Sequence, residues 1–215
     1  MAIEVPLGKD VDLKLEILER SSDALHCRYT AVNLSGVDLY LFNRLYHDLR
    51  DDGIFDIDPD LVYVEAENAT LLLSKRIPDV PEDLLVEAFI VPCVTVLASG
   101  DRLVEPFSLG LPPQLMNPYM RDLCTPVASF DSVVFSLGYV RSTELGSRHV
   151  ETVRSIAGPA LHIDVTAEQQ LVVRTAPVSA SVVSPRAARN CPRCGAATSP
   201  GSRFCNQCGA PLQAK

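Results

Sequence analysis

The sequence predicts an all-β body followed by a small cysteine-rich unit near the C-terminal end. Three observations support this prediction. Through most of the chain before about residue 180, apolar and polar residues alternate with a period of two, as in strands that bury one face. No helical pattern of about 12 or more residues competes with this alternation. Four of the seven cysteines lie within residues 191–208, and the other three are scattered.

Length and composition are those of a folded globular protein. The chain has 215 residues, of which 47% are hydrophobic and 21% charged, so it can bury a core without disulfide bonds. The prior of about 150 residues per domain gives one large domain and something small. No apolar stretch reaches about 18 residues, so we expect no membrane insertion. The start lacks the features of a signal peptide and the number of cysteines is odd, which together favour a reducing cytoplasm.

The strands of the body are expected from alternation and from turn signals. Leu13, Leu15 and Ile17 share one face of a strand, and residues 25–31 alternate in the same way. Residues 33–36 predict the turn of a hairpin that returns through 37–42. Further strands are expected at residues 61–65, 70–75, 87–97, 102–109, 132–140, 161–165 and 170–175. Regular short strands separated by turns indicate an antiparallel β-sandwich, Ig-like or related, over residues 1–176.

Two segments of the body are harder to assign. Residues 111–126 contain prolines and are amphipathic, with apolar side chains at Leu115, Met116, Tyr119, Met120 and Leu123. We expect this segment to be a loop or short helix that caps one end of the sandwich, and a partner-binding surface is the alternative. Residues 144–156 fit either a helix or a strand.

Charge divides the chain into an acidic body and a basic tail. Residues 1–183 hold 14 basic and 27 acidic residues (14 − 27 = −13), whereas residues 184–215 hold five basic residues and no acidic ones. An acidic body repels a phosphate backbone and is a poor nucleic-acid binder. The basic tail could bind phosphates or fold back on the body. Residues 177–190, rich in Ala, Ser, Val and Pro, predict a flexible linker between the two.

The four clustered cysteines form two Cys-x-x-Cys-Gly motifs. The first contains Cys191 and Cys194, and the second contains Cys205 and Cys208. Zinc prefers four such thiolates in a tetrahedron at about 2.3 Å, and a closed set of four leaves no open position for catalysis. So small a unit cannot fold on apolar burial alone, and metal binding contributes roughly 10–16 kcal/mol in comparable zinc peptides. We therefore expect one structural zinc ion.

This pattern resembles the short bacterial zinc ribbons, in which a Phe precedes the second motif and a Leu follows it. Here those residues are Phe204 and Leu212, and the resemblance covers residues 191–212 only. Ribbons of this kind are appended to many unrelated proteins, so the resemblance implies zinc and contacts with protein or nucleic acid. Two redox dithiols and a rubredoxin-like iron site are the alternatives for the same cysteines.

Other possible sites are weak. Asp56, Asp58, Asp60 and Glu67 fit positions 1, 3, 5 and 12 of a calcium loop, but Leu61 replaces the required glycine, which favours a solvated acidic loop. The four histidines are dispersed, and no phosphate-binding or nucleophile motif occurs. Cys27, Cys93 and Cys124 are expected to be buried, inert thiols. No catalytic or cofactor-binding residue is assigned, and we expect no enzymatic activity.

The leading functional hypothesis is a non-enzymatic adaptor that binds or assembles proteins. In it the β-sandwich recognises a protein partner or a second copy of the chain, and the tethered zinc ribbon adds another contact. A homo-oligomer is compatible with the exposed edges of such sheets. The alternative is a nucleic-acid-associated factor whose basic tail contacts phosphates through Arg186, Arg189, Arg193 and Arg203. An enzyme with its site in the sandwich loops is the third hypothesis.

Overall fold

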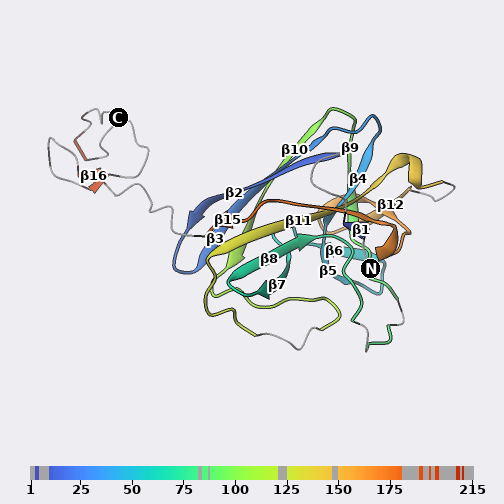
Figure 1. Cartoon of the computed structure of the whole chain (residues 1–215), viewed down its shortest axis with the longest axis horizontal. Coiled ribbons are helices and arrows are strands. Elements are labelled where there is room, and N and C mark those ends of the chain that lie inside the picture. The colour runs from blue at the N-terminus through green and yellow to red at the C-terminus, as the bar shows by residue number, and fades with distance from the viewer. Residues whose placement is uncertain are drawn as a thin grey trace. The chain divides into compact units, whose positions relative to one another are not determined.

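The chain divides into two compact units, Met1–Ala180 and Ser181–Lys215. The structure is a computed structural model (Figure 1). It describes residues 3–4, 10–81, 84–86, 88–120, 125–146, 150–180, 189–190, 194, 197–198, 207–208 and 210. No helix among these residues is long and apolar enough to cross a membrane.

The first unit is built from strands, which confirms the all-β prediction, whereas the Ig-like detail stays a prediction. Its only helical turns among the described residues are two 3-10 turns, η1 (Ser142–Glu144) and η2 (Ala167–Gln169). Three strands form a small antiparallel sheet in the order β10-β3-β2, and twelve form a large mixed sheet. The small sheet contains β2 (Val11–Arg20), β3 (Ala24–Asn33) and β10 (Arg102–Gly110). The large sheet contains β1 (Ile3–Glu4), β4 (Leu39–Arg44), β5 (Tyr46–Leu49), β6 (Ile54–Ile57), β7 (Tyr63–Glu67), β8 (Thr70–Lys75), β9 (Cys93–Leu97), β11 (Ser132–Arg141), β12 (Val150–Ser155), β13 (Gly158–Ile163), β14 (Leu171–Arg174) and β15 (Val178–Ser179).

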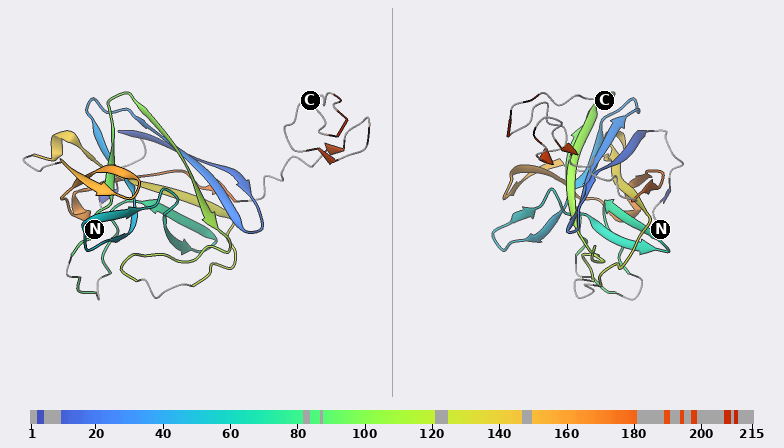
Figure 2. Two further views of the ribbon diagram at one scale, coloured as in Figure 1. Left: turned by 180° about the vertical axis from the view of Figure 1, so that it is seen from behind. Right: turned by 90° about the vertical axis from the view of Figure 1, so that its left-hand side faces the viewer.

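The main core lies between the two sheets. Alternate residues of β2 and β3, such as Leu13, Leu15 and Tyr29, pack on apolar residues of the large sheet, as the period of two requires. The rings of Tyr29, Phe107 and Phe135 lie in contact, and the centroids of Tyr29 and Phe135 are 4.8 Å apart. Figure 2 shows β2 and β3 in blue beside the green β10.

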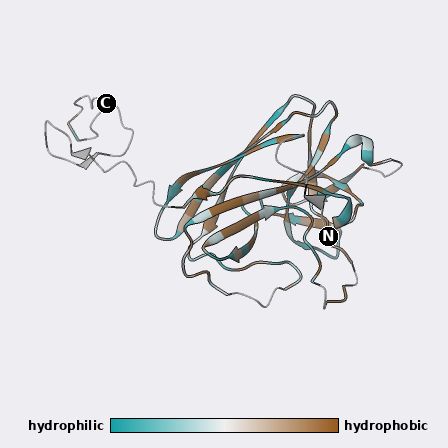
Figure 3. Cartoon of the chain, in the orientation of Figure 1, coloured by the Kyte–Doolittle hydropathy of each residue, from teal (hydrophilic) through white to brown (hydrophobic). Residues whose placement is uncertain are grey.

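Strand β11 organises the large sheet. One side of β11 pairs with β8 and then β4, and the other side pairs with β15 and then β14. The two faces of β11 pack into different cores. Leu137 and Tyr139 belong to the main core, and Val140 belongs to a second core. This double burial explains its nearly continuous apolar sequence, which Figure 3 shows as a mainly brown arrow.

Parallel pairing is the main departure from the predicted antiparallel sandwich. Within the described residues, β8 pairs in parallel with β11 over six positions, β1 with β14 and β6 with β12. The β7–β8 hairpin is antiparallel, as residues 61–75 predict. A parallel pair joins segments far apart in the chain, and no turn signal between neighbouring strands can reveal it.

Several predicted boundaries move. Among the described residues of the apolar run 87–97, only Cys93–Leu97 form a strand. The described residues of 144–156 contain the end of η1 and then β12. Val178 and Ser179 belong to β15, which pairs with β11, so the first unit ends at Ala180 and these residues are not part of the linker. Burial of apolar side chains against neighbouring strands decides these ends, and residue type alone does not.

A buried glutamine joins the segment that follows β8 to the segment that precedes β14. The side chain of Gln170 is fully buried, accepts from the backbone N–H of Ile77 (2.9 Å) and donates to its carbonyl (2.7 Å). Gly138 on β11 lies against this contact. A Cβ at Gly138 would come within 2.7 Å of Arg76 Cβ and closer still to Gln170 Oε1. The backbone therefore requires glycine at this position.

The side chain of Lys75 is buried inside the first unit. Lys75 is only 1% exposed, donates from Nζ to the carbonyl of Pro59 (2.7 Å) and lies 6.0 Å from the centre of the Phe107 ring. Burial lowers the pKa of Lys75 to about 8, an effect that the negative charge of Glu105 opposes. Glu105 in turn accepts from the Tyr29 hydroxyl (2.5 Å) and from Asn43 Nδ2 (3.0 Å).

The described part of the second unit contains one hairpin. Strand β16 (Arg189–Asn190) pairs in antiparallel fashion with β17 (Ala197–Thr198), with Asn190 opposite Ala197. Gln207 and Cys208 form a turn farther along the chain.

Candidate functional site

The predicted metal ligands are partly within the described residues. Strands β16 and β17 pair on either side of residues 191–196 in the sequence, and of these residues the structure describes Cys194. Cys194 is exposed in a turn of the first motif, and Cys208 is half-buried in a turn of the second motif. Cys191 and Cys205 lie outside the described residues. The Cys-x-x-Cys spacing of the two motifs is one that structural zinc sites use for pairs of ligands.

The donor set of the second unit fits zinc. Two Cys-x-x-Cys motifs supply four soft thiolates, and the hairpin around the first motif places a turn where a ligand is predicted. Cys191, Cys194, Cys205 and Cys208 would hold the ion. Bound zinc would supply folding free energy to the unit, and four protein ligands would leave no position for a reacting molecule. Among the described residues alone, no group of three or more His, Cys, Asp or Glu side chains is placed to hold a metal.

The acidic residues of the calcium-like pattern bind local partners instead. Oδ2 of Asp58 lies 2.9 Å from Nε2 of His47, and Oδ1 of Asp58 accepts from the backbone N–H of Asp60. Oδ1 of Asp60 accepts from the backbone N–H of Ser108 (2.8 Å). These bonds fold the loop onto β5 and β10, so in the described part of the chain it is an acidic turn and no metal cluster.

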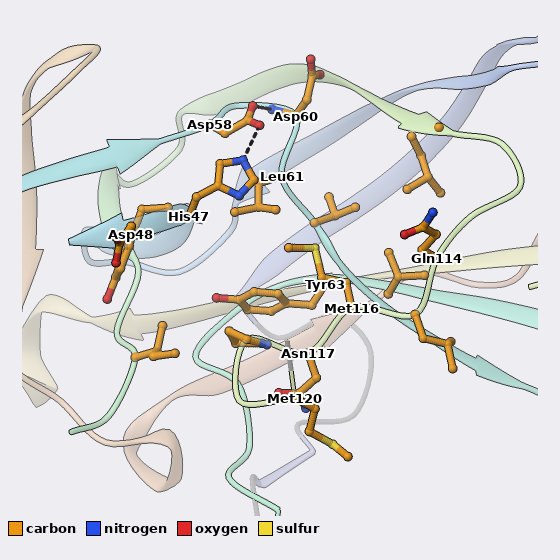
Figure 4. Close-up of a pocket in the computed structure, with 18 of the residues that line it drawn as sticks. His47, Asp48, Asp58, Asp60, Leu61, Tyr63, Gln114, Met116, Asn117 and Met120 are labelled. Carbon is orange, nitrogen blue, oxygen red and sulfur yellow. Dashed lines mark hydrogen bonds and ion pairs between the residues drawn. The ribbon is translucent and has the colours of Figure 1, made fainter. Parts of the chain in front are cut away.

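A large open hollow lies on the first unit, and the sequence did not reveal it. Its volume is about 1020 Å³, at the upper end of the range of ligand sites. Five separate segments line it: Asp23 in the turn between β2 and β3, β5, the connection from β6 into β7, residues 88–90, and the end of β10 with the loop that follows it. Figure 4 shows Leu61, Tyr63 and Met116 inside the hollow, with Asp48, Asp58 and Asp60 around them.

Backbone hydrogen bonds fix the walls of this hollow. Val64 and Met116 exchange two backbone bonds of 3.0 and 2.9 Å, and Leu111 N–H donates to the carbonyl of Asp23. The backbone N–H of Ile90 donates to the Tyr119 hydroxyl (2.9 Å). The hollow is therefore preformed, because each wall is tied to another element of the unit.

The loop after β10 decides between the two forms predicted for residues 111–126, a loop and a short helix. Residues 111–120 and 125–126 contain no helix and form isolated bridges to Val64 and within the loop itself. The loop alternative is therefore correct for the described residues, and Leu123 lies outside them. Its apolar residues Leu115, Met116 and Met120 line the hollow, and Met120 is 41% exposed.

The rim of the hollow is acidic. The described residues of its lining include Asp23, Asp48, Asp58 and Asp60 and no lysine or arginine. Burial alone would raise the pKa of Asp58, but the hydrogen bonds from His47 and from the backbone of Asp60 outweigh burial and lower it. The Asp58 carboxylate is therefore ionised at neutral pH.

The histidines do not assemble a catalytic group. Nδ1 of His26 lies 2.9 Å from the Ser108 hydroxyl, but no carboxylate in the described residues bonds to the other ring nitrogen. Without a third group to orient the imidazole, the pair lacks the arrangement that activates a serine. His47 pairs with Asp58, His162 stacks near Phe55, and His149 lies outside the described residues.

Cys27 and Cys93 are core residues. Both are fully buried, and burial raises the pKa of each thiol to about 12. A thiol with so high a pKa carries almost no reactive thiolate at neutral pH. Cys124, the third scattered cysteine, lies outside the described residues.

Comparison with known proteins identifies the second unit alone. Residues 190–212 match the zinc-ribbon domain family, which covers about a tenth of the chain. The second unit therefore carries a zinc-binding module, and the β unit is unassigned. Neither a curated protein nor a solved structure shows significant similarity to this chain.

Proposed function

We propose that this protein is a non-enzymatic adaptor, in which the β unit recognises a protein partner and the zinc ribbon supplies a second contact. The observation that carries the proposal is the preformed hollow of the β unit. Leu49, Phe89 and Met120 line it with exposed fractions of 49%, 59% and 41%. Large apolar side chains gathered in one exposed concavity are typical of a surface that another molecule covers.

The second unit adds to this proposal through its tether and its metal. Closed tetrahedral zinc stabilises a small fold and performs no reaction, so the ribbon would present a surface. Two weak contacts on one chain gain from effective concentration, and losing either lowers the overall affinity by about 10²–10⁴-fold when both engage together. One zinc ion per chain and a cytoplasmic location belong to the same proposal.

The test is affinity capture with the full chain as bait, in native lysate treated with nuclease, read by mass spectrometry. Phe89→Asp places a charge in the hollow, and Ile156→Asp is the matched control because Ile156 is 54% exposed on a turn outside the hollow. We expect a specific protein that is retained by the control and lost at least 10-fold with Phe89→Asp. A Cys191→Ser, Cys205→Ser double variant measures the contribution of the ribbon.

Two results would contradict the proposal. One is capture of no protein above the level of an unrelated bait. The other is recovery that disappears on nuclease treatment and depends on the ribbon alone, which would favour the nucleic-acid alternative.

A further inference from the structure

The hollow contains a hydroxyl that bonds none of the described residues, that of Tyr63. Tyr63 is only 4% exposed, and its ring points into the hollow beside Met116 (Figure 4). No hydrogen bond joins its hydroxyl to any of the described residues, although Tyr29 and Tyr139, also buried, each donate to a carboxylate. The residue is buried as a whole, but its hydroxyl oxygen is not among the buried side-chain atoms that lack a partner, so the oxygen can be reached from the hollow and can donate to an acceptor bound there.

The phenol of Tyr63 is a donor under all ordinary conditions. Burial raises the pKa of Tyr63, and the neighbouring Tyr46 and Tyr119 act in the same direction. The neutral hydroxyl can therefore donate to a carbonyl oxygen at any pH at which the protein is folded.

The acidic rim favours a ligand that carries a positive charge. Oδ1 of Asp48 accepts from the backbone N–H of Leu49, and Asp60 accepts from Ser108, but neither carboxylate forms an ion pair with a described residue. Among the described residues the lining holds no lysine or arginine. His47 pairs with Asp58, and the buried Lys75 also attracts Asp58 and Asp60, so these two side chains only partly offset the four aspartates. A cation bound at this rim would meet carboxylates that no basic side chain of the lining neutralises.

Resting on the proposed function, we propose that the hollow binds an extended peptide segment of the partner, in which a lysine or arginine stands next to apolar residues. The apolar side chains would lie on Leu61 and Met116, the cation at Asp48 and Asp60, and a backbone carbonyl at the Tyr63 hydroxyl. A peptide supplies all three features within a few residues. A simple amine or a lipid would lack either the carbonyl or the positive charge next to apolar groups.

The experiment uses the full chain and a displayed library of random linear heptapeptides as the probe. We expect selected peptides to share a Lys or Arg beside Leu, Ile or Phe. Resynthesised peptides should bind about 10-fold more weakly to the Asp48→Asn, Asp60→Asn double variant, and this difference should shrink in high salt. Asn keeps the oxygen that accepts from Ser108, so the rim retains its fold.

Tyr63→Phe tests the hydroxyl separately. It removes one oxygen atom that has no partner in the described residues, so the unfolding midpoint should not fall, whereas peptide affinity should fall about 5-fold at every salt concentration. Ile156→Asp should bind the peptides as the native chain does.

Selected peptides without basic residues, or peptides whose binding ignores both variants, would overturn the inference. An absence of selected peptides would also overturn it, while capture that depends on Phe89 would still uphold the adaptor proposal. The converse result, peptides that bind as expected with no captured protein, would reject the adaptor and retain the binding site.

Discussion

The two units of this chain are stabilised by different means. The β unit buries aromatic and aliphatic side chains between two sheets, including Tyr29, Phe107 and Phe135. Residues 191–215 have only Phe204 and Leu212 as large apolar side chains, together with four cysteines. Apolar burial contributes roughly 25 cal/mol per Å², which suffices for the first unit and not for the second. From this comparison we expect the first unit to fold without a metal ion and the second to depend on bound zinc.

The largest expected effect is the loss of zinc. Replacing Cys191 and Cys205 with serine removes two of four ligands, and the roughly 10–16 kcal/mol that zinc supplies to such units is lost. Elemental analysis should show about one zinc per native chain and well below one per variant chain. The urea unfolding of the β unit should stay within about 0.5 kcal/mol of the native value. Cys93→Ala is the reverse control, since it should weaken the β unit and leave the zinc content unchanged.

The next effect concerns the buried charge of Lys75. Its pKa is about 8 in the folded unit against 10.5 in the unfolded chain, so below pH 8 both states are charged and burial penalises the folded one. As the pH rises from 8 to 10.5 the folded state loses its proton first, and stability rises by about 3 kcal/mol on this account. Lys75→Met removes the charge at every pH. Its stability advantage over the native chain should therefore shrink by about 3 kcal/mol across that interval.

Urea unfolding at several pH values measures this difference directly. Ionisation of tyrosines and cysteines in the unfolded chain also changes stability at high pH, but it affects both proteins equally and cancels in the difference. Lys14→Met is the matched control, since the Lys14 side chain is 69% exposed. A difference between Lys75→Met and the native chain that stays constant with pH would show that Lys75 is not enclosed as described.

A smaller effect on stability is expected where Gly138 of β11 lies against Arg76 and Gln170. Gly138→Ala introduces a Cβ that would overlap Arg76 and Gln170, so we expect the β unit to lose about 2 kcal/mol. Gly36→Ala is the control, because a Cβ there meets no atom within 4 Å. The zinc content should be the same in both variants. Equal stability of the Gly138→Ala and Gly36→Ala variants would show that Arg76 and Gln170 do not pack closely against Gly138.

The sequence predicted those parts that depend on local signals. Alternation in residues 13–18 and 25–31 located β2 and β3, and the two cysteine motifs located the ribbon within a few residues. The parallel pairing of β8 with β11 could not be predicted, because residues 70–75 and 132–137 carry no signal that they are neighbours. Long-range pairing is decided by the packing of the whole unit.

The hollow is a product of tertiary structure for the same reason. Asp48, Tyr63, Phe89 and Met116 come from four segments, and none of them stands out in its own part of the sequence. The amphipathic character of residues 111–126 was the one usable signal, and it did suggest a partner-binding surface as an alternative. An unpartnered Tyr63 hydroxyl is visible only when its surroundings are known.

The position of β11 has a consequence for how the chain acquires its structure. This strand pairs with residues 39–41 and 70–75 on one side and with residues 171–174 and 178–179 on the other. A growing chain can complete the sheet of β2, β3 and β10 once residue 110 has emerged, but the large sheet must wait for residue 179. Until then the edge of β11 that pairs with β14 and β15 has no partner strand. Since non-local pairing slows folding, the β unit is expected to fold in milliseconds to seconds, with its last strand closing the structure.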